Sequence, residues 1–125
     1  MRKILIITVV AVSSALVGLL TGRAAPAADA GGQSLFGQCA ACHSTDGSNG
    51  VGPTLKGVVG RASASVPGFA YSNPMKRAHL TWSNDELDKW LANPQDVVPG
   101  NAMPYAGMPD GQQRAALIAY LGTLK

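Results

Sequence analysis

Two cysteines and a histidine lie close together, in the run Cys39-Ala40-Ala41-Cys42-His43. A thiol can add across a vinyl group of haem, and a C-x-x-C-H run has the spacing that attaches both vinyl groups. The histidine that follows is then placed beside the iron, for which an imidazole nitrogen is a good ligand. The pattern predicts that Cys39 and Cys42 attach one haem c covalently and that His43 binds its iron.

A structural disulfide and a redox-active thiol pair are the two alternative roles for the cysteines. A disulfide between Cys39 and Cys42 would close a very short loop and would restrict the unfolded chain little. A thioredoxin-like thiol pair belongs to a fold in which strands alternate with helices, and the sequence has no strand pattern of useful length. Haem attachment is the favoured interpretation, because the motif accompanies an N-terminal export pattern.

The N-terminus has the three parts of an export signal. Arg2 and Lys3 give a positive start, Ile4 to Leu20 is an uncharged and largely apolar run, and Ala28-Asp29-Ala30 is a small-x-small cleavage site. The apolar run of 17 residues lies at the lower edge of the length that spans a bilayer of about 30 Å. The sequence predicts a cleaved signal peptide, with an uncleaved membrane anchor as the alternative.

These boundaries divide the chain into a signal peptide, residues 1–30, and one domain, residues 31–125. The whole sequence has ten Lys and Arg and seven Asp and Glu. Loss of residues 1–30 removes three basic residues and one acidic residue, which leaves seven against six, a net charge near +1. Nucleic-acid binding needs a clustered basic face to neutralise phosphates. We therefore expect no nucleic-acid partner, and contact with a membrane only if residues 1–30 are retained.

Helix signals recur along the domain, and they indicate an all-α fold class. The predicted helices are Gln33–His43, Asn73–Ala78, Ser83–Asn93 and a last helix that Asp110 caps. Asn73 followed by Pro74 is typical of a helix start, and Ser83 with Glu86 three residues later forms a capping box. Residues 44–59 are rich in Gly and predict an irregular loop that can wrap closely around a flat cofactor.

The last predicted helix carries an apolar stripe. Leu117, Tyr120, Leu121 and Leu124 repeat at i, i+3, i+4 and i+7. Such a stripe covers one face of a helix and has to be buried. We expect the first helix to cover it.

Motifs typical of one family follow the cysteine pair in order. They are Gly52-Pro53-x-Leu55, Pro67-Gly68-Phe69-x-Tyr71-Ser72, Leu80-Thr81-Trp82, Trp90-Leu91-x-Asn93-Pro94, Pro99-Gly100-x-x-Met103 and Leu117-Ile118-x-Tyr120-Leu121. With these motifs, residues 31–125 resemble the class I cytochromes c, the small soluble or anchored electron carriers of bacteria and mitochondria. The resemblance implies a fold in which the N- and C-terminal helices pack together while loops wrap one haem.

The same resemblance supplies a second axial ligand. The family places a methionine sulfur in the loop before the last helix, and Met103 occupies that position. A thioether is a soft ligand, and His/Met ligation raises the reduction potential. Met108 is the rival, while Met75 and Met108 both suit the role of flexible core fillers.

Four further residues match the family's contacts around the haem. The Pro53 carbonyl is expected to accept a hydrogen bond from His43. Tyr71 and Trp82 match donors to a buried haem propionate, and Arg61 matches a nearby cation that offsets its charge. Core packing is the plainer role for Tyr71 and Trp82.

The sequence departs from the family in two places. Trp90 stands where the family usually has a tyrosine beside the methionine, and an indole can donate a hydrogen bond but not accept one. Few lysines are available to ring the haem edge, as they do in mitochondrial members. His79 lies in a polar stretch, where we expect a solvent-exposed or backbone-bonded side chain rather than an iron ligand.

The resemblance implies a monohaem, monomeric one-electron carrier in the periplasm rather than an enzyme. Its expected partners are redox proteins: a quinol:cytochrome c reductase, a terminal oxidase, a reaction centre or a periplasmic dehydrogenase. One alternative is a dedicated electron-acceptor subunit of one periplasmic dehydrogenase. The other is a haem enzyme or gas sensor with an open iron position, which would require that Met103 does not bind the iron.

Overall fold

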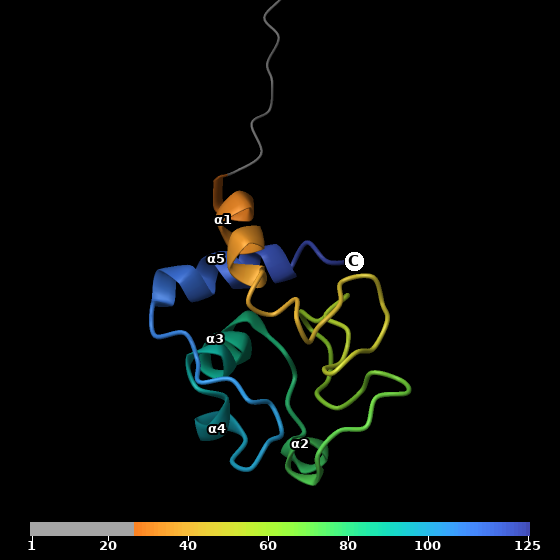
Figure 1. The fold of residues 1–125 in the computed structure, drawn as a ribbon. Helices are drawn as coiled ribbons and strands as arrows, with labels where there is room; N and C mark the ends of the chain where they lie inside the picture. Colours follow the sequence, from red (N-terminus) through yellow and green to blue (C-terminus); the bar gives the residue numbers. More distant parts are fainter. Residues whose placement is uncertain (1–26) are drawn as a thin grey trace, which may run out of the picture.

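The computed structural model describes residues 27–125, and in that part of the chain every regular element is a helix (Figure 1). The helices are α1 (Ala27–Phe36), α2 (Asn73–Ala78), α3 (Asn84–Ala92), α4 (Pro94–Val97) and α5 (Gly111–Leu121). Between residues 27 and 125, β pairing is limited to one isolated antiparallel bridge from Ala62 to Thr81. No helix of this described part is long and apolar enough to cross a bilayer. Most of the predicted signal peptide, residues 1–26, lies outside the described residues.

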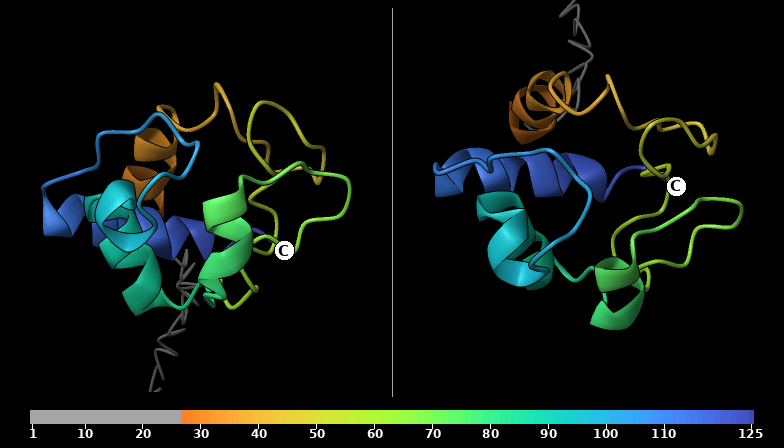
Figure 2. Two further views of the ribbon diagram at one scale, coloured as in Figure 1. Left: turned by 90° about the horizontal axis from the view of Figure 1, so that it is seen from below. Right: turned by 60° about the horizontal axis from the view of Figure 1, so that its bottom comes forward.

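The first and last helices, α1 and α5, pack across one another, as predicted (Figures 1 and 2). Phe36 and Tyr120 meet at this crossing with ring centroids 5.5 Å apart. Gly32 lies so close to α5 that an added Cβ would overlap the Ala116 carbonyl and the Tyr120 Cβ. The glycine is therefore required by the close approach of the two helices.

The predicted range of the first helix, Gln33–His43, is wrong at both ends. The helix begins at Ala27 and ends at Phe36. Beyond Phe36 the backbone tightens into turns, in which Gly37 N–H donates to Ser34 O at 3.1 Å and Cys39 N–H to Phe36 O at 2.8 Å. Bonds from residue i+3 to residue i are a common way for a helix to end. The cysteines consequently lie in a turn and not on a helix.

Polar caps fix where the helices begin. The Ser83 hydroxyl accepts from Glu86 N–H at the start of α3, and the Asp110 carboxylate accepts from the N–H groups of Gln112 and Gln113 at the start of α5. Both predicted N-caps are confirmed, but the reciprocal half of the predicted capping box is not formed, because the Ser83 N–H donates to the Thr81 carbonyl and the Glu86 carboxylate pairs with Lys89. At α2 the cap is Ser72, one residue before the predicted Asn73. The side chain of a cap residue satisfies backbone donors that have no partner within the helix.

The short helix α4 is absent from the sequence prediction, which ends a helix at Asn93. Asn93 ends α3 and also caps α4, because its side chain accepts a hydrogen bond from Gln95 N–H at 3.2 Å. Pro94 is then the first residue of α4, a position where its missing N–H costs nothing. The same Asn-Pro pair therefore stops one helix and starts the next.

The core lies between α3, α5 and the end of α1. The inner face of α3, formed by Leu87, Trp90 and Leu91, is buried, as are Leu117 and Leu121 of α5. On the outside, the Arg114 guanidinium of α5 pairs with Asp88 of α3, with Nε 2.7 Å from Oδ1. Residues 44–59 form the predicted irregular loop beside this helical part (Figure 2). Helices on one side and loops on the other leave a cavity between them.

Candidate functional site

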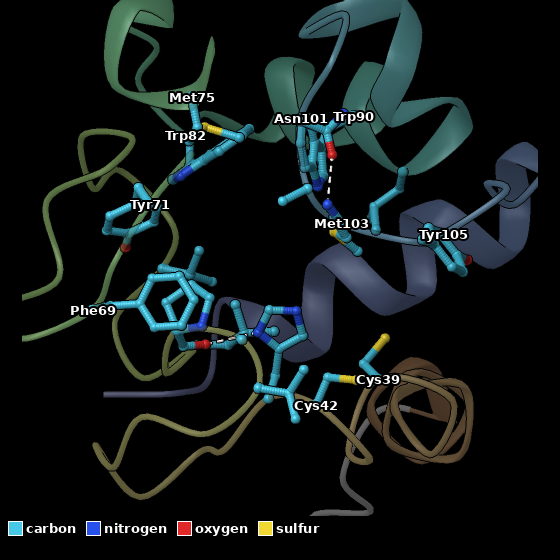
Figure 3. Close-up of a pocket in the computed structure, with 18 of the residues that line it drawn as sticks. Cys39, Cys42, Phe69, Tyr71, Met75, Trp82, Trp90, Asn101, Met103 and Tyr105 are labelled. Carbon is cyan, nitrogen blue, oxygen red and sulfur yellow. Dashed lines mark hydrogen bonds between the residues drawn. The ribbon is translucent and has the colours of Figure 1, made fainter. Parts of the chain in front are cut away.

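A cavity of about 350 Å³ lies between the helices and the loops (Figure 3). Its lining is mostly apolar and includes Leu55, Val58, Met75, Trp82, Leu87, Trp90, Leu91, Leu117 and Leu121. It is open at the surface, because Val51 also lines it and is 78% exposed. A largely apolar cavity with a few polar groups is typical of a cofactor site.

Cys39 and Cys42 lie together on one side of the cavity (Figure 3). Both are half-buried and free of disulfide bonds. Burial, with a smaller contribution from Cys42, raises the pKa of the Cys39 thiol. Both side chains border the cavity and can react with a group inside it.

The ring of His43 is fixed from two directions. Its Nδ1 donates to the Pro53 carbonyl at 2.7 Å, as predicted from the family resemblance. Gly52 lies against the ring so closely that an added Cβ would come within 2.5 Å of Cε1 and 2.7 Å of Nδ1. Because a carbonyl can only accept, Nδ1 carries the proton and Nε2 keeps a free lone pair. His43 lines the cavity and is prepared to bind a metal.

Met103 lies across the open space from the two cysteines (Figure 3). Met108 takes a different position: it is buried in the core, and its N–H donates to the Leu91 carbonyl at 2.7 Å. Met108 is not among the residues that line the cavity, whereas Met75 is. Of the two candidates for a ligand, only Met103 therefore borders the space that His43 faces.

Asn101 holds the chain just before Met103, and no sequence pattern pointed to it. Its buried side chain donates from Nδ2 to the carbonyls of Pro94 and Val98, and its Oδ1 accepts from Met103 N–H at 2.9 Å (Figure 3). Gln95 supports the same turn by donating to the Asn101 carbonyl at 3.2 Å. A buried amide is stable when its groups are paired. Asn101 therefore ties the backbone of Met103 to the end of α4.

Arg61, Tyr71 and Trp82 border another side of the cavity. Arg61 donates to the carbonyls of Lys56 and Thr54 at 2.8 and 2.9 Å, but its buried Nε has no hydrogen-bond partner in the described part of the chain. Burial lowers the pKa of the Arg61 guanidinium. The Tyr71 hydroxyl accepts from Val66 N–H at 3.3 Å, which leaves its own proton free to donate.

These side chains fit a haem. Two thiols, an imidazole with a free Nε2 and a thioether border one largely apolar space. A buried N–H without an acceptor is rare and costly, so the Arg61 Nε indicates that an anionic or carbonyl group completes the site. A propionate would supply such an acceptor.

Trp90 and His79 occupy very different places. Trp90 is buried, lines the cavity and meets Trp82 edge to face, with ring centroids 5.2 Å apart. His79 is exposed and ends α2 with a left-handed backbone, φ 50°. It does not border the cavity, in agreement with the prediction that it is not an iron ligand.

Comparison with known proteins agrees with this geometry. The pattern of the family described as Cytochrome c matches residues 30–125. The chain belongs to the cytochrome c family. It is 49% identical to cytochrome c2 iso-2 of Magnetospirillum fulvum over 90 residues, which cover 71% of this chain and 94% of that protein. It is 47% identical to the cytochrome c-type cyt cy of Rhodobacter capsulatus over 97 residues, which cover 78% of this chain and 49% of that protein.

The fold is shared with a solved cytochrome. Cytochrome cH from Methylobacterium extorquens superposes with a TM-score of 0.74 at 44% identity, covering 76% of this chain and 97% of that chain. The predicted class I cytochrome c fold is therefore confirmed. Against cyt cy, the chain spans about half of the relative's length. As a cytochrome c, the protein carries covalently bound haem c and transfers electrons.

Proposed function

We propose that this cytochrome c is exported to the periplasm and carries single electrons between redox complexes. The observation that carries the proposal is the placement of Cys39, Cys42, His43 and Met103 around one apolar cavity. In this proposal residues 1–30 are the signal peptide and residues 31–125 the working domain. The charge pattern of residues 1–30 and the small residues before position 31 support export.

In the proposed site, Cys39 and Cys42 would hold the haem through thioether links, and His43 and Met103 would bind its iron. The haem, when bound, supplies an iron that alternates between ferric and ferrous states. The chain's part is to keep both ligands in place: Pro53 and Gly52 hold the His43 ring, and Asn101 directs Met103. Ligands held this firmly move little between the two states, which favours rapid electron transfer.

We further propose that Arg61, Tyr71 and Trp82 bind one propionate. The Arg61 Nε and the Tyr71 hydroxyl both have a proton to donate beside the cavity. A charge-assisted hydrogen bond from a guanidinium is stronger than a neutral one. These donors would hold the propionate as a carboxylate in a site where burial alone would favour the neutral acid.

The proposed partners are redox proteins that dock in turn at the open side of the cavity. A quinol:cytochrome c reductase, a terminal oxidase, a reaction centre and a periplasmic dehydrogenase all fit this chemistry. Electron-transfer interfaces are small and weak, as repeated exchange of partners requires. A domain near +1 gives little long-range steering, so we expect association to depend only modestly on salt. We also propose that the carrier is a monomer, as the family resemblance implies.

Optical spectra of the protein from the periplasmic fraction test this proposal. We expect low-spin spectra, a weak far-red sulfur-to-iron band in the ferric form, and no change of the ferrous form with carbon monoxide. Met103→Ala should abolish the far-red band. Met108→Ala is the matched control and should retain it, since Met108 lies outside the cavity.

Three results would contradict parts of the proposal. Loss of the band in Met108→Ala and its retention in Met103→Ala would move the ligand to Met108. A high-spin wild-type spectrum that responds to carbon monoxide would indicate an open iron and an enzyme or sensor. Full-length protein retained in the membrane fraction would mean that residues 1–30 act as an anchor.

A further inference from the structure

A hydrogen bond joins two segments that are far apart in the sequence and that both border the cavity. The Tyr105 hydroxyl donates to Gln38 Oε1 at 3.2 Å. Gln38 lies in the turn between α1 and Cys39, and both Gln38 and Tyr105 line the cavity. Within residues 27–125, this is the only hydrogen bond that joins the turn 37–43 to residues 98–110.

The same tyrosine is coupled directly to Met103. Tyr105 N–H donates to the Met103 carbonyl at 2.9 Å, so the two residues form one short turn. On the inner side, Met103 N–H is held by the buried Asn101. From residue 102 to residue 107, the bond to Gln38 is the only described hydrogen bond to a part of the domain outside residues 101–107.

We propose that the hydrogen bond between Tyr105 and Gln38 is a latch. It keeps residues 102–107, the Met103 segment, closed over the cavity. Tyr105 is then a positioning residue for Met103: it acts through the turn that it shares with that residue. Asn101 anchors the inner end of the segment permanently, whereas the latch can open without disturbing the core. The proposal rests on the proposed function, because it takes Met103 as the iron ligand.

Tyr105→Phe tests the latch, since it keeps the ring and removes only the hydroxyl. In the holoprotein, we expect the amide of residue 105 to exchange its hydrogen about threefold to fivefold faster. The factor reflects the net contribution of one partly exposed hydrogen bond. Imidazole binding to the ferric protein should tighten by the same factor, because imidazole reaches the iron only after the Met103 segment opens.

Two further variants separate the latch from general loosening of the fold. Tyr120→Phe is the matched control, because Tyr120 packs on Phe36 at the crossing of α1 and α5, away from the cavity lining. We expect it to change neither measurement. Gln38→Leu should have the effect of Tyr105→Phe, and the double variant should have no larger effect, as holds for two partners of one interaction.

Unchanged amide exchange and unchanged imidazole affinity in Tyr105→Phe would overturn the latch, as would additive effects of the two substitutions. Failure of the proposed function is distinguishable. If the wild-type protein lacks the sulfur-to-iron band, the assignment of Met103 as ligand is wrong. The ratio of the exchange rates at residue 105 in Tyr105→Phe and in the wild-type protein can be measured whichever sulfur binds iron, so it still decides whether the latch exists.

Discussion

At the scale of single residues, Asp46 shows how one exposed carboxylate shapes a loop beside the cavity. Its Oδ1 accepts hydrogen bonds from the Ser48 hydroxyl at 2.6 Å and from the Ser48 N–H at 2.9 Å. These bonds to Ser48, with a further one from Ser44, lower the pKa of Asp46 to about 2. The turn at residues 46–48 is therefore best formed when Asp46 is ionised.

This turn should depend on pH only in strongly acid solution. The pKa of Asp46 is depressed in the folded protein, so its stabilising effect is complete above about pH 4, the range of an ordinary aspartate. The effect is lost as the pH falls towards about 2. A carboxyl titration followed by NMR should show a midpoint near pH 2 for Asp46.

Ser48→Ala should raise that midpoint towards the ordinary value, because the hydroxyl makes the largest contribution to the shift. Ser65→Ala is the control, since the Ser65 hydroxyl donates to the Ala62 carbonyl and takes no part in this turn. An Asp46 midpoint near 4 in the wild-type protein would contradict the turn described here.

At the scale of elements, the crossing of α1 and α5 depends on one small residue. Gly32→Ala should destabilise the holoprotein by about 1–3 kcal/mol, the usual cost of forcing extra atoms into a packed contact. The added Cβ would overlap the backbone of Ala116. Chemical unfolding followed by circular dichroism would measure the loss.

Gly31→Ala is the matched control, because an added Cβ at Gly31 meets nothing within 4 Å. We expect it to leave the unfolding free energy unchanged or to raise it by up to about 1 kcal/mol, because alanine favours a helix interior over glycine. Equal losses in the two variants would show that backbone flexibility, and not the crossing, explains the need for glycine.

The elements that local patterns specify were predictable, and those that depend on distant partners were not. Ser83 and Asp110 start helices because their own side chains satisfy nearby N–H groups, so a short window of sequence contains the whole cause. The need for Gly32 arises from Ala116 and Tyr120, which are far along the chain. The end of α1 at Phe36 was not predicted either. The turns that follow it place Cys39 and Cys42 beside the cavity, and the position of the cavity depends on distant parts of the chain.

The residues of the candidate site also fall into two groups, those that sequence motifs predict and those that depend on distant partners. The C-x-x-C-H run and the family resemblance together gave every residue predicted around the haem, and all eight border the cavity. Asn101 and the pair Gln38 and Tyr105 were not found, because each acts through a hydrogen bond whose partner depends on the path of a loop. The local sequence around Asn101, Gln38 or Tyr105 does not indicate which residue its side chain will bind.

At the scale of the whole molecule, the cavity adjoins the core, because buried residues of α3 and α5, Leu87, Leu91, Leu117 and Leu121, also line it. Without the cofactor, the mostly apolar lining of the cavity would stay in contact with water, in a domain that already buries a small fraction of its surface. Small proteins have about 5–15 kcal/mol of stability in total. The haem therefore completes the core as well as carrying the electron.

Cys39→Ser combined with Cys42→Ser should accordingly give a protein that is both free of covalent haem and largely unfolded. Haem staining of a denaturing gel would test the attachment, and far-ultraviolet circular dichroism of the purified apoprotein would test the folding. The wild-type holoprotein is the control and should show both haem stain and cooperative unfolding. Retained stain in the double variant would contradict attachment through these cysteines. A cooperatively folded apoprotein would instead show that the helices can close the cavity without the cofactor.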